Sequence, residues 1–79
     1  MDVAVTVPEV SGEPAELFFV QWLIEVGAQV REGEPIALLE ADKAQVEILA
    51  PATGRLSSIS AHPDDAIAAG QAVGILEVP

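Results

Sequence analysis

The sequence contains no cysteine. It can therefore form no disulfide, no thiolate metal site and no cysteine nucleophile, so any thiol chemistry has to come from an attached group, and no metal site is predicted. Aromatic residues make up only 4% of the 79 residues, so Val, Ile, Leu and Ala must build most of the core. Because ligand pockets occupy about 300–1,000 Å³, a single domain spanning residues 1–79 is a poor host for an enclosed active site.

Basic residues are also scarce. Arg31, Lys43 and Arg55 stand against 13 Asp and Glu residues, which gives a net charge of −10. Nucleic acid and anionic membrane surfaces repel such a chain, so neither is expected as a partner, whereas basic protein surfaces attract it. The longest apolar run, residues 17–24, is interrupted by Gln21 and is shorter than the ~20 residues that span a bilayer. The first residues show no signal-peptide pattern, so we expect a cytoplasmic location, or the mitochondrial matrix in a eukaryote.

Apolar residues alternate with others over residues 3–7 and 44–48. A period of two is typical of half-buried strands. The stretch 15–24 is interpreted as a strand because it is rich in β-forming residues, with Phe19 and Trp22 expected in the core. Short runs of this kind, separated by Gly, Pro and Asp, predict an all-β sandwich or barrel.

The sequence also repeats itself. Gly33 matches Gly70 at a shift of 37, and Pro8 matches Pro51 at a shift of 43. The apolar positions follow the same two shifts, which indicates two copies of one β unit. The first copy holds six extra residues, which we assign to an exposed loop over residues 9–15.

Lys43, the only lysine, occupies a distinctive place in this repeat. The shifts relate the two chain ends to the residues on either side of it, so a two-fold axis would place Lys43 and the termini at opposite ends of the domain. Three residues separate the expected strands 36–40 and 44–49, which suits a tight hairpin. Because no glycine supplies a positive φ, we expect a type I turn with Asp42 and Lys43 at its centre.

A lysine exposed at a hairpin tip allows several interpretations. It can be an ordinary solvated side chain beside an aspartate. A Schiff-base nucleophile is disfavoured, because that role needs burial to lower the pKa of the amine. An attachment site is the third possibility, because the amine is accessible to a modifying enzyme.

The stretch Glu40-Ala41-Asp42-Lys43-Ala44-Gln45-Val46-Glu47-Ile48 resembles the lipoyl-attachment motif of the biotinyl/lipoyl domain family. Its Asp-Lys-Ala core is similar to that of lipoyl domains in the dihydrolipoamide acyltransferase (E2) of 2-oxo acid dehydrogenase complexes. The resemblance covers nearly the whole chain and includes Trp22, residues 26–30, Gly33, residues 50–54 and Gly70. It implies a flattened barrel-sandwich hybrid of two small antiparallel sheets with internal pseudo-two-fold symmetry.

The resemblance implies that lipoate is attached covalently to Lys43 and that Glu40, Asp42 and Ala44 serve in recognition, together with the loop 9–15. The lipoyl-lysine would shuttle acyl groups and reducing equivalents between active sites. The implied partners are a lipoate ligase or lipoyl transferase, a thiamine-diphosphate 2-oxo acid decarboxylase (E1) and dihydrolipoamide dehydrogenase (E3). The isolated domain is expected to be a monomer without catalysis of its own, either free-standing or part of an acyltransferase.

Two alternatives and two departures from the pattern accompany this interpretation. A biotin carrier domain shares the fold but normally places its lysine between two methionines, whereas Asp42 and Ala44 flank it here. A non-carrier barrel-sandwich module of an adaptor protein would need no special pattern around the lysine. Leu17 stands where a glycine commonly opens the second strand, and residues 61–66 of the second copy contain no glycine.

Overall fold

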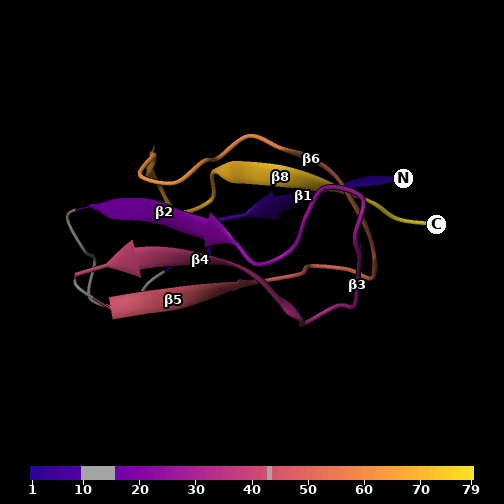
Figure 1. Cartoon of the computed structure of the whole chain (residues 1–79), viewed down its shortest axis with the longest axis horizontal. Helices are drawn as coiled ribbons and strands as arrows, with labels where there is room; N and C mark the ends of the chain where they lie inside the picture. The colour runs from indigo at the N-terminus through magenta and orange to yellow at the C-terminus, as the bar shows by residue number, and fades with distance from the viewer. Residues whose placement is uncertain (10–15, 43) are drawn as a thin grey trace.

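The computed structural model describes residues 1–9, 16–42 and 44–79, which form two facing antiparallel sheets (Figure 1). One sheet has the strand order β1-β8-β6-β3 and the other β5-β4-β2-β7. The strands are β1 Asp2–Thr6, β2 Leu17–Trp22, β3 Gln29–Val30, β4 Pro35–Ala41, β5 Ala44–Leu49, β6 Gly54–Ile59, β7 Ala66–Ile67 and β8 Ala72–Glu77. The predicted all-β fold of two small antiparallel sheets is confirmed. In the described segments, no helix is long and apolar enough to cross a membrane.

Strand β2 shows how the sequence pattern produces these sheets. Leu17 and Phe19 are buried, whereas Phe18 and Val20 between them are half-buried. Successive side chains of a strand point to opposite faces, so β2 places one set in the core and the other on the outer face. Aromatic and β-branched residues suit such a pleated surface. The interpretation of this stretch as a strand is therefore confirmed, within the shorter bounds of β2.

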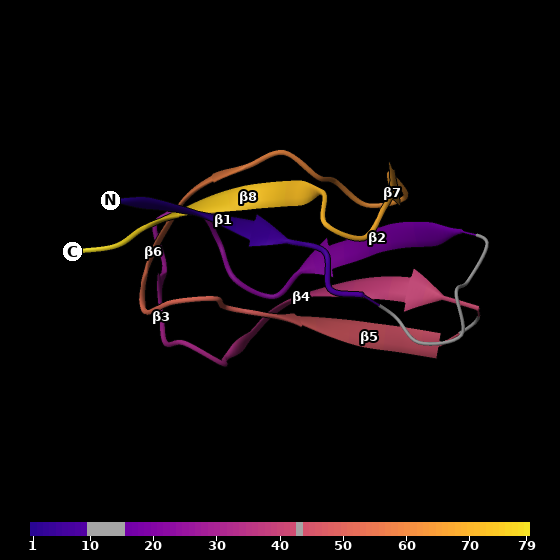
Figure 2. The same ribbon diagram turned by 180° about the vertical axis from the view of Figure 1, so that it is seen from behind.

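The two chain ends lie together at one end of an elongated body measuring 37 × 20 × 17 Å. The Met1 ammonium donates to the Val78 carbonyl oxygen at 2.9 Å, and the Val78 N–H donates to the Met1 carbonyl oxygen at 2.7 Å. The end of β4 and the start of β5 lie at the opposite end in both views (Figures 1 and 2). The predicted separation of the termini from this end of the hairpin is confirmed, although Lys43 itself lies outside the described residues.

The sequence repeat corresponds to a structural one. Strands β2 and β6 have the same burial pattern, position by position, and so do β3 and β7. The Gly33 N–H donates to the Ala50 carbonyl oxygen, and the equivalent Gly70 N–H donates to the Val7 carbonyl oxygen, both at 2.9 Å. Exchanging each strand for its counterpart converts one sheet order into the other. The predicted pseudo-two-fold relation is therefore present in topology, burial and hydrogen bonding.

One turn of the second copy forms without the glycine that the first copy uses. Gly27 has φ 98°, and its counterpart Asp64 has φ 72°. Both residues therefore adopt left-handed backbone conformations, which aspartate tolerates better than most residues with a side chain. The missing glycine in residues 61–66 thus leaves the turn conformation unchanged.

The core lies between the inner faces of the two sheets and is entirely apolar among the described residues. Both copies contribute equally to it, because each large side chain has a buried counterpart in the other half. The largest fully buried side chains are Phe19, Ile36, Leu39, Ile48, Leu56, Leu76, Val5 and Val73. Burying apolar area stabilises by roughly 25 cal/mol per Å², so the contact between the two sheets supplies most of the stability.

Phe19 and Trp22 form the aromatic part of this core, as predicted. Their ring centroids lie 5.3 Å apart at an interplanar angle of 45°. Phe19 is fully buried, whereas Trp22 packs against the core from a partly buried position. The indole N–H of Trp22 donates to the Ala61 carbonyl oxygen at 3.0 Å, which satisfies its polar group and ties β2 to the segment after β6.

Gly54 opens β6 at a point of close backbone contact. A Cβ atom at this position would lie 2.5 Å from the Glu77 carbonyl oxygen, which belongs to the neighbouring strand β8. The counterpart of Gly54 in the first copy is Leu17, whose side chain is only 8% exposed. The two halves therefore differ at the starts of β2 and β6.

We expect Gly54→Ala to lower the free energy of unfolding by about 1–3 kcal/mol, the usual range for overpacking a fixed site. Urea denaturation of the two proteins measures the difference. Arg55→Ala, at the next position, is the matched control and should change stability by less than about 1 kcal/mol, because its ion pair is exposed. Equal stability of wild type and Gly54→Ala would contradict the close contact.

Candidate functional site

The β4–β5 connection is a turn of two residues. Ala41 and Ala44 are register partners at the ends of the two strands, so the chain reverses over residues 42–43. Asp42 has φ 47°. A type I turn needs φ of about −60° at its first central residue, whereas the type I′ turn of two-residue hairpins needs a positive value. The predicted type I turn is therefore wrong, and the reason is that aspartate adopts the left-handed region here without a glycine.

The flanking residues meet at one end of the sheet. Glu40, Asp42 and Ala44 are all exposed, whereas Ala41 points inward and is 4% exposed. The structure thus brings together the three residues predicted to serve in recognition, around a buried alanine that anchors the end of β4. Lys43, the predicted attachment residue, lies outside the described residues.

Strand β2 begins beside this turn. Leu17 is the register partner of both Ala41 and Ile67, so it lies between β4 and β7, level with the last residue of β4. Residues 10–15 of the predicted loop lie outside the described residues, but the chain enters β2 through the exposed Glu16. The acidic character of this end therefore continues from the turn to the start of β2.

Phe18 is a surface residue near the turn that the sequence analysis did not single out. It is the register partner of Glu40 on β4 and of Ala66 on β7. Register partners of an antiparallel pair lie on the same face with Cβ atoms about 4.5–5.5 Å apart. Phe18 and the Glu40 carboxylate therefore share the outer face of the sheet. The shift of 37 aligns Phe18 with the charged residue Arg55, and this match could have indicated that Phe18 occupies a surface position.

The described charged residues around the turn, Glu16, Glu40 and Asp42, are acidic. Two ion pairs can form within the described ranges, Arg55 with Glu77 and, when its imidazole is protonated, His62 with Asp65, and neither involves the turn. Within those ranges, the carboxylates of Glu40 and Asp42 therefore have no ion-pair partner. Exposed charges of one sign attract oppositely charged surfaces over roughly a Debye length of about 8 Å at physiological salt.

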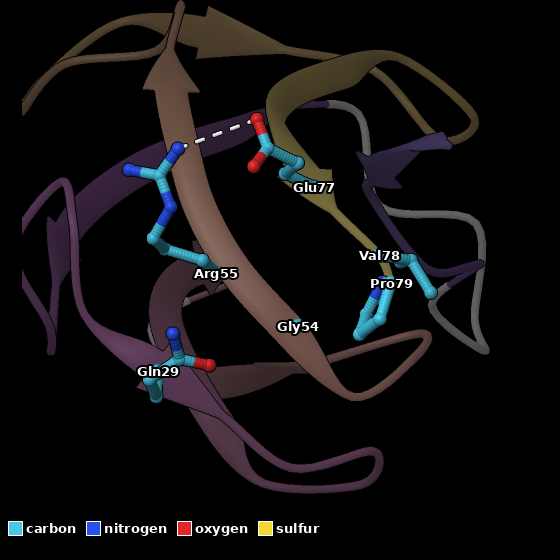
Figure 3. Close-up of a pocket in the computed structure, with 6 residues that line it drawn as sticks. All are labelled: Gln29, Gly54, Arg55, Glu77, Val78 and Pro79. Carbon is cyan, nitrogen blue, oxygen red and sulfur yellow. Dashed lines mark hydrogen bonds and ion pairs between the residues drawn. The ribbon is translucent and has the colours of Figure 1, made fainter.

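A hollow of about 210 Å³ lies at the other end of the molecule, where β3, the start of β6 and the C-terminal end of the chain meet (Figure 3). Its wall carries an ion pair in which Arg55 Nη2 and Glu77 Oε2 are 3.3 Å apart. Small-molecule sites usually occupy about 300–1,000 Å³, so this hollow is undersized for a ligand. It is lined by Gln29, Gly54, Arg55, Glu77, Val78 and Pro79.

Comparison with known protein families assigns the chain to one of them. The model of the biotin/lipoyl family, described as biotin-requiring enzyme, matches residues 3–76. The chain belongs to this family. The biotin/lipoyl family attaches either of two groups, so membership defines the fold and the type of site and leaves the identity of the group open.

Similar curated proteins are components of 2-oxo acid dehydrogenase complexes. One is the dihydrolipoyllysine-residue succinyltransferase component of the 2-oxoglutarate dehydrogenase complex of Staphylococcus saprophyticus, 36% identical over 91% of this chain. Another is the lipoamide acyltransferase component of the branched-chain alpha-keto acid dehydrogenase complex of Pseudomonas aeruginosa, 34% identical over 94%. The chain spans only 17% of the length of each of these relatives.

Solved structures show the same relationship. The lipoyl domain of the 2-oxoglutarate dehydrogenase complex from Azotobacter vinelandii superposes with a TM-score of 0.71 and 26% identity, covering 95% of this chain and 98% of that one. A urea carboxylase from Kluyveromyces lactis superposes with a TM-score of 0.83 at 19% identity, covering 98% of this chain and 6% of that one, and shows the fold alone. The predicted resemblance to a lipoyl domain is confirmed.

We expect Asp42→Ala to lower the free energy of unfolding by about 1 kcal/mol, because a left-handed conformation costs most side chains roughly 1–2 kcal/mol. Asp42→Asn and Asp42→Gly should be closer to wild type, since both replacements tolerate a positive φ. Urea denaturation of the four proteins measures this order. If Asp42→Ala were as stable as Asp42→Asn, the result would contradict the left-handed backbone conformation of Asp42.

Proposed function

We propose that this chain is a lipoyl carrier domain in which lipoate is joined by an amide bond to Nζ of Lys43. The observation that supports this best is the two-residue β4–β5 turn, which contains the only lysine and lies opposite the chain ends. Any chain continuing from either terminus would be joined at the far end of the 37 Å body. Such a tether leaves the turn free to enter partner sites at a high effective concentration.

The residues around the turn fit a covalently attached group. Attachment through a lysine amine needs an accessible turn rather than a pocket, and the flanking residues Asp42 and Ala44 are exposed. When bound, the lipoyl group supplies a dithiolane that can carry an acyl group and two electrons. The domain contributes the amine, the β4–β5 hairpin that contains it and an acidic surface for recognition. Amide formation removes the positive charge of the amine, so the turn becomes more acidic.

Lipoate is favoured over biotin for two reasons. Asp42 and Ala44 flank the lysine where biotin carriers normally have methionines, and the sole methionine is Met1. The relatives that are 34–36% identical are named for lipoamide or dihydrolipoyllysine. The likeness to the urea carboxylase is 19% identical and supports the fold only.

The relatives' names also support a parent complex. We propose that the domain is part of, or accessory to, a dihydrolipoamide acyltransferase, in the cytoplasm or in a mitochondrial matrix. There it would pass acyl groups and electrons among a thiamine-diphosphate decarboxylase (E1), the acyltransferase and dihydrolipoamide dehydrogenase (E3). A lipoate ligase or lipoyl transferase would load Lys43. Glu40, Asp42 and Ala44 would serve in recognition by these enzymes, because they surround the lysine and are exposed.

Lipoylation is tested by intact-mass spectrometry after incubation with a purified lipoate–protein ligase, lipoate and ATP. We expect wild type to gain one lipoyl increment and Lys43→Arg to gain none, because Lys43 is the only lysine in the sequence. A parallel incubation with a biotin ligase and biotin should leave the mass unchanged. An unmodified wild type or a biotinyl increment would contradict the proposal.

A further inference from the structure

The pseudo-two-fold axis places an equivalent row of four residues on the outer face at each end of the molecule. Each row crosses four strands through register partners, one position before the turn or the termini. The row at the termini is Gln29, Arg55, Glu77 and Asp2. The row at the turn is Ala66, Phe18, Glu40 and Gln45. The two rows differ in the residue beside the glutamate, which is Arg55 at the termini and Phe18 at the turn.

At the termini, the row contains its own cation. Arg55 Nη2 lies 3.3 Å from Glu77 Oε2, with side chains that are 41% and 56% exposed (Figure 3). Arg55 and Glu77 are register partners on β6 and β8. A guanidinium therefore fits beside the carboxylate in this geometry on the surface of this fold.

At the turn, an aromatic side chain replaces that cation. Phe18 occupies the position equivalent to Arg55, and both are half-buried. Glu40, the counterpart of Glu77, is exposed and belongs to neither ion pair of the described residues. Phe18 and Glu40 thus place an aromatic side chain beside a carboxylate that has no ion-pair partner among the described residues. This combination suits a guanidinium, which stacks on aromatic rings and binds carboxylates through two parallel hydrogen bonds.

We propose that Phe18 and Glu40 form a seat for an arginine side chain of the enzyme that attaches lipoate to Lys43. The proposal rests on the carrier function proposed above and identifies how the loading enzyme recognises the domain. The charge complementarity is direct, because the chain carries a net charge of −10. Of its other cations, Arg55 is paired at the far end, and Arg31 follows β3 in the opposite sheet.

The loading enzyme is the partner whose contact has to be closest. Before attachment, the amine is carried only by the lysine side chain, so the ligase must cover the surface next to the turn. After attachment, the long lipoyl arm lets other active sites stand farther from the domain. A seat one row from the turn is therefore placed for the ligase.

The test compares steady-state kcat/KM for lipoylation by a purified lipoate–protein ligase, with lipoate and ATP, followed by intact mass. Glu40→Gln removes the charge, and we expect it to lower kcat/KM about tenfold, as for a contact central to an interface. Phe18→Arg copies the terminal pair, so its own guanidinium should occupy Glu40 and raise KM to a similar extent with kcat unchanged. Glu77→Gln and Arg55→Phe, the matched changes at the far end, should leave kcat/KM within about twofold of wild type.

A binding measurement complements the kinetics. Lys43→Arg cannot be loaded but should inhibit loading of wild type competitively, and adding Glu40→Gln to it should raise the inhibition constant about tenfold. Thermal unfolding checks that each variant is folded. If Phe18→Arg does not fold, the exposed and isosteric Glu40→Gln still decides the matter.

The outcomes separate the two proposals. Failure of the ligase to load wild type overturns the carrier function itself. Normal loading of wild type, with Glu40→Gln within about twofold of it in kcat/KM, overturns the arginine seat and leaves the carrier function standing. Equal losses from Glu40→Gln and Glu77→Gln would also overturn the seat, because they would reflect overall charge rather than a specific contact.

Discussion

The whole structure depends on the burial of two sheets against each other. Among the described residues the core contains no polar side chain, so no internal hydrogen-bond network or charge pair orients it. Each four-stranded sheet has an apolar inner face that the other sheet covers, and small sheets depend on packing of such a face for their stability. The pseudo-two-fold repeat meets this constraint by supplying two matching apolar faces from one pattern.

Because the repeat has to match only in the core, the two ends of the molecule are free to differ. The starts of β2 and β6 are equivalent in topology, yet Leu17 buries a large side chain beside Ala41, whereas Gly54 allows backbone contact with Glu77. Likewise, Phe18 and Arg55 occupy equivalent surface positions. The repeat thus maintains the core, while the two ends of the molecule carry different side chains at equivalent positions.

Much of this architecture could be predicted from the sequence, because alternation and the two shifts are local patterns that survive in the fold. These patterns predicted the strand over residues 44–49, and they predicted that the turn and the termini lie at opposite ends. The turn type did not, because the left-handed φ of Asp42 depends on how the twist of β4 and β5 is closed, which composition does not reveal. Phe18 was missed because an aromatic residue in a strand is usually taken as core, and only register shows that it lies beside Glu40.

The paired chain ends have a consequence for how such a domain can be built into larger proteins. Met1 and Val78 exchange backbone hydrogen bonds, so the polypeptide enters and leaves at almost one point. A host loop interrupted by this domain would have to bridge only the distance between neighbouring strands. The unit is therefore suited to serve as an internal insert as well as a terminal extension, and in either setting its β4–β5 hairpin would extend away from the host.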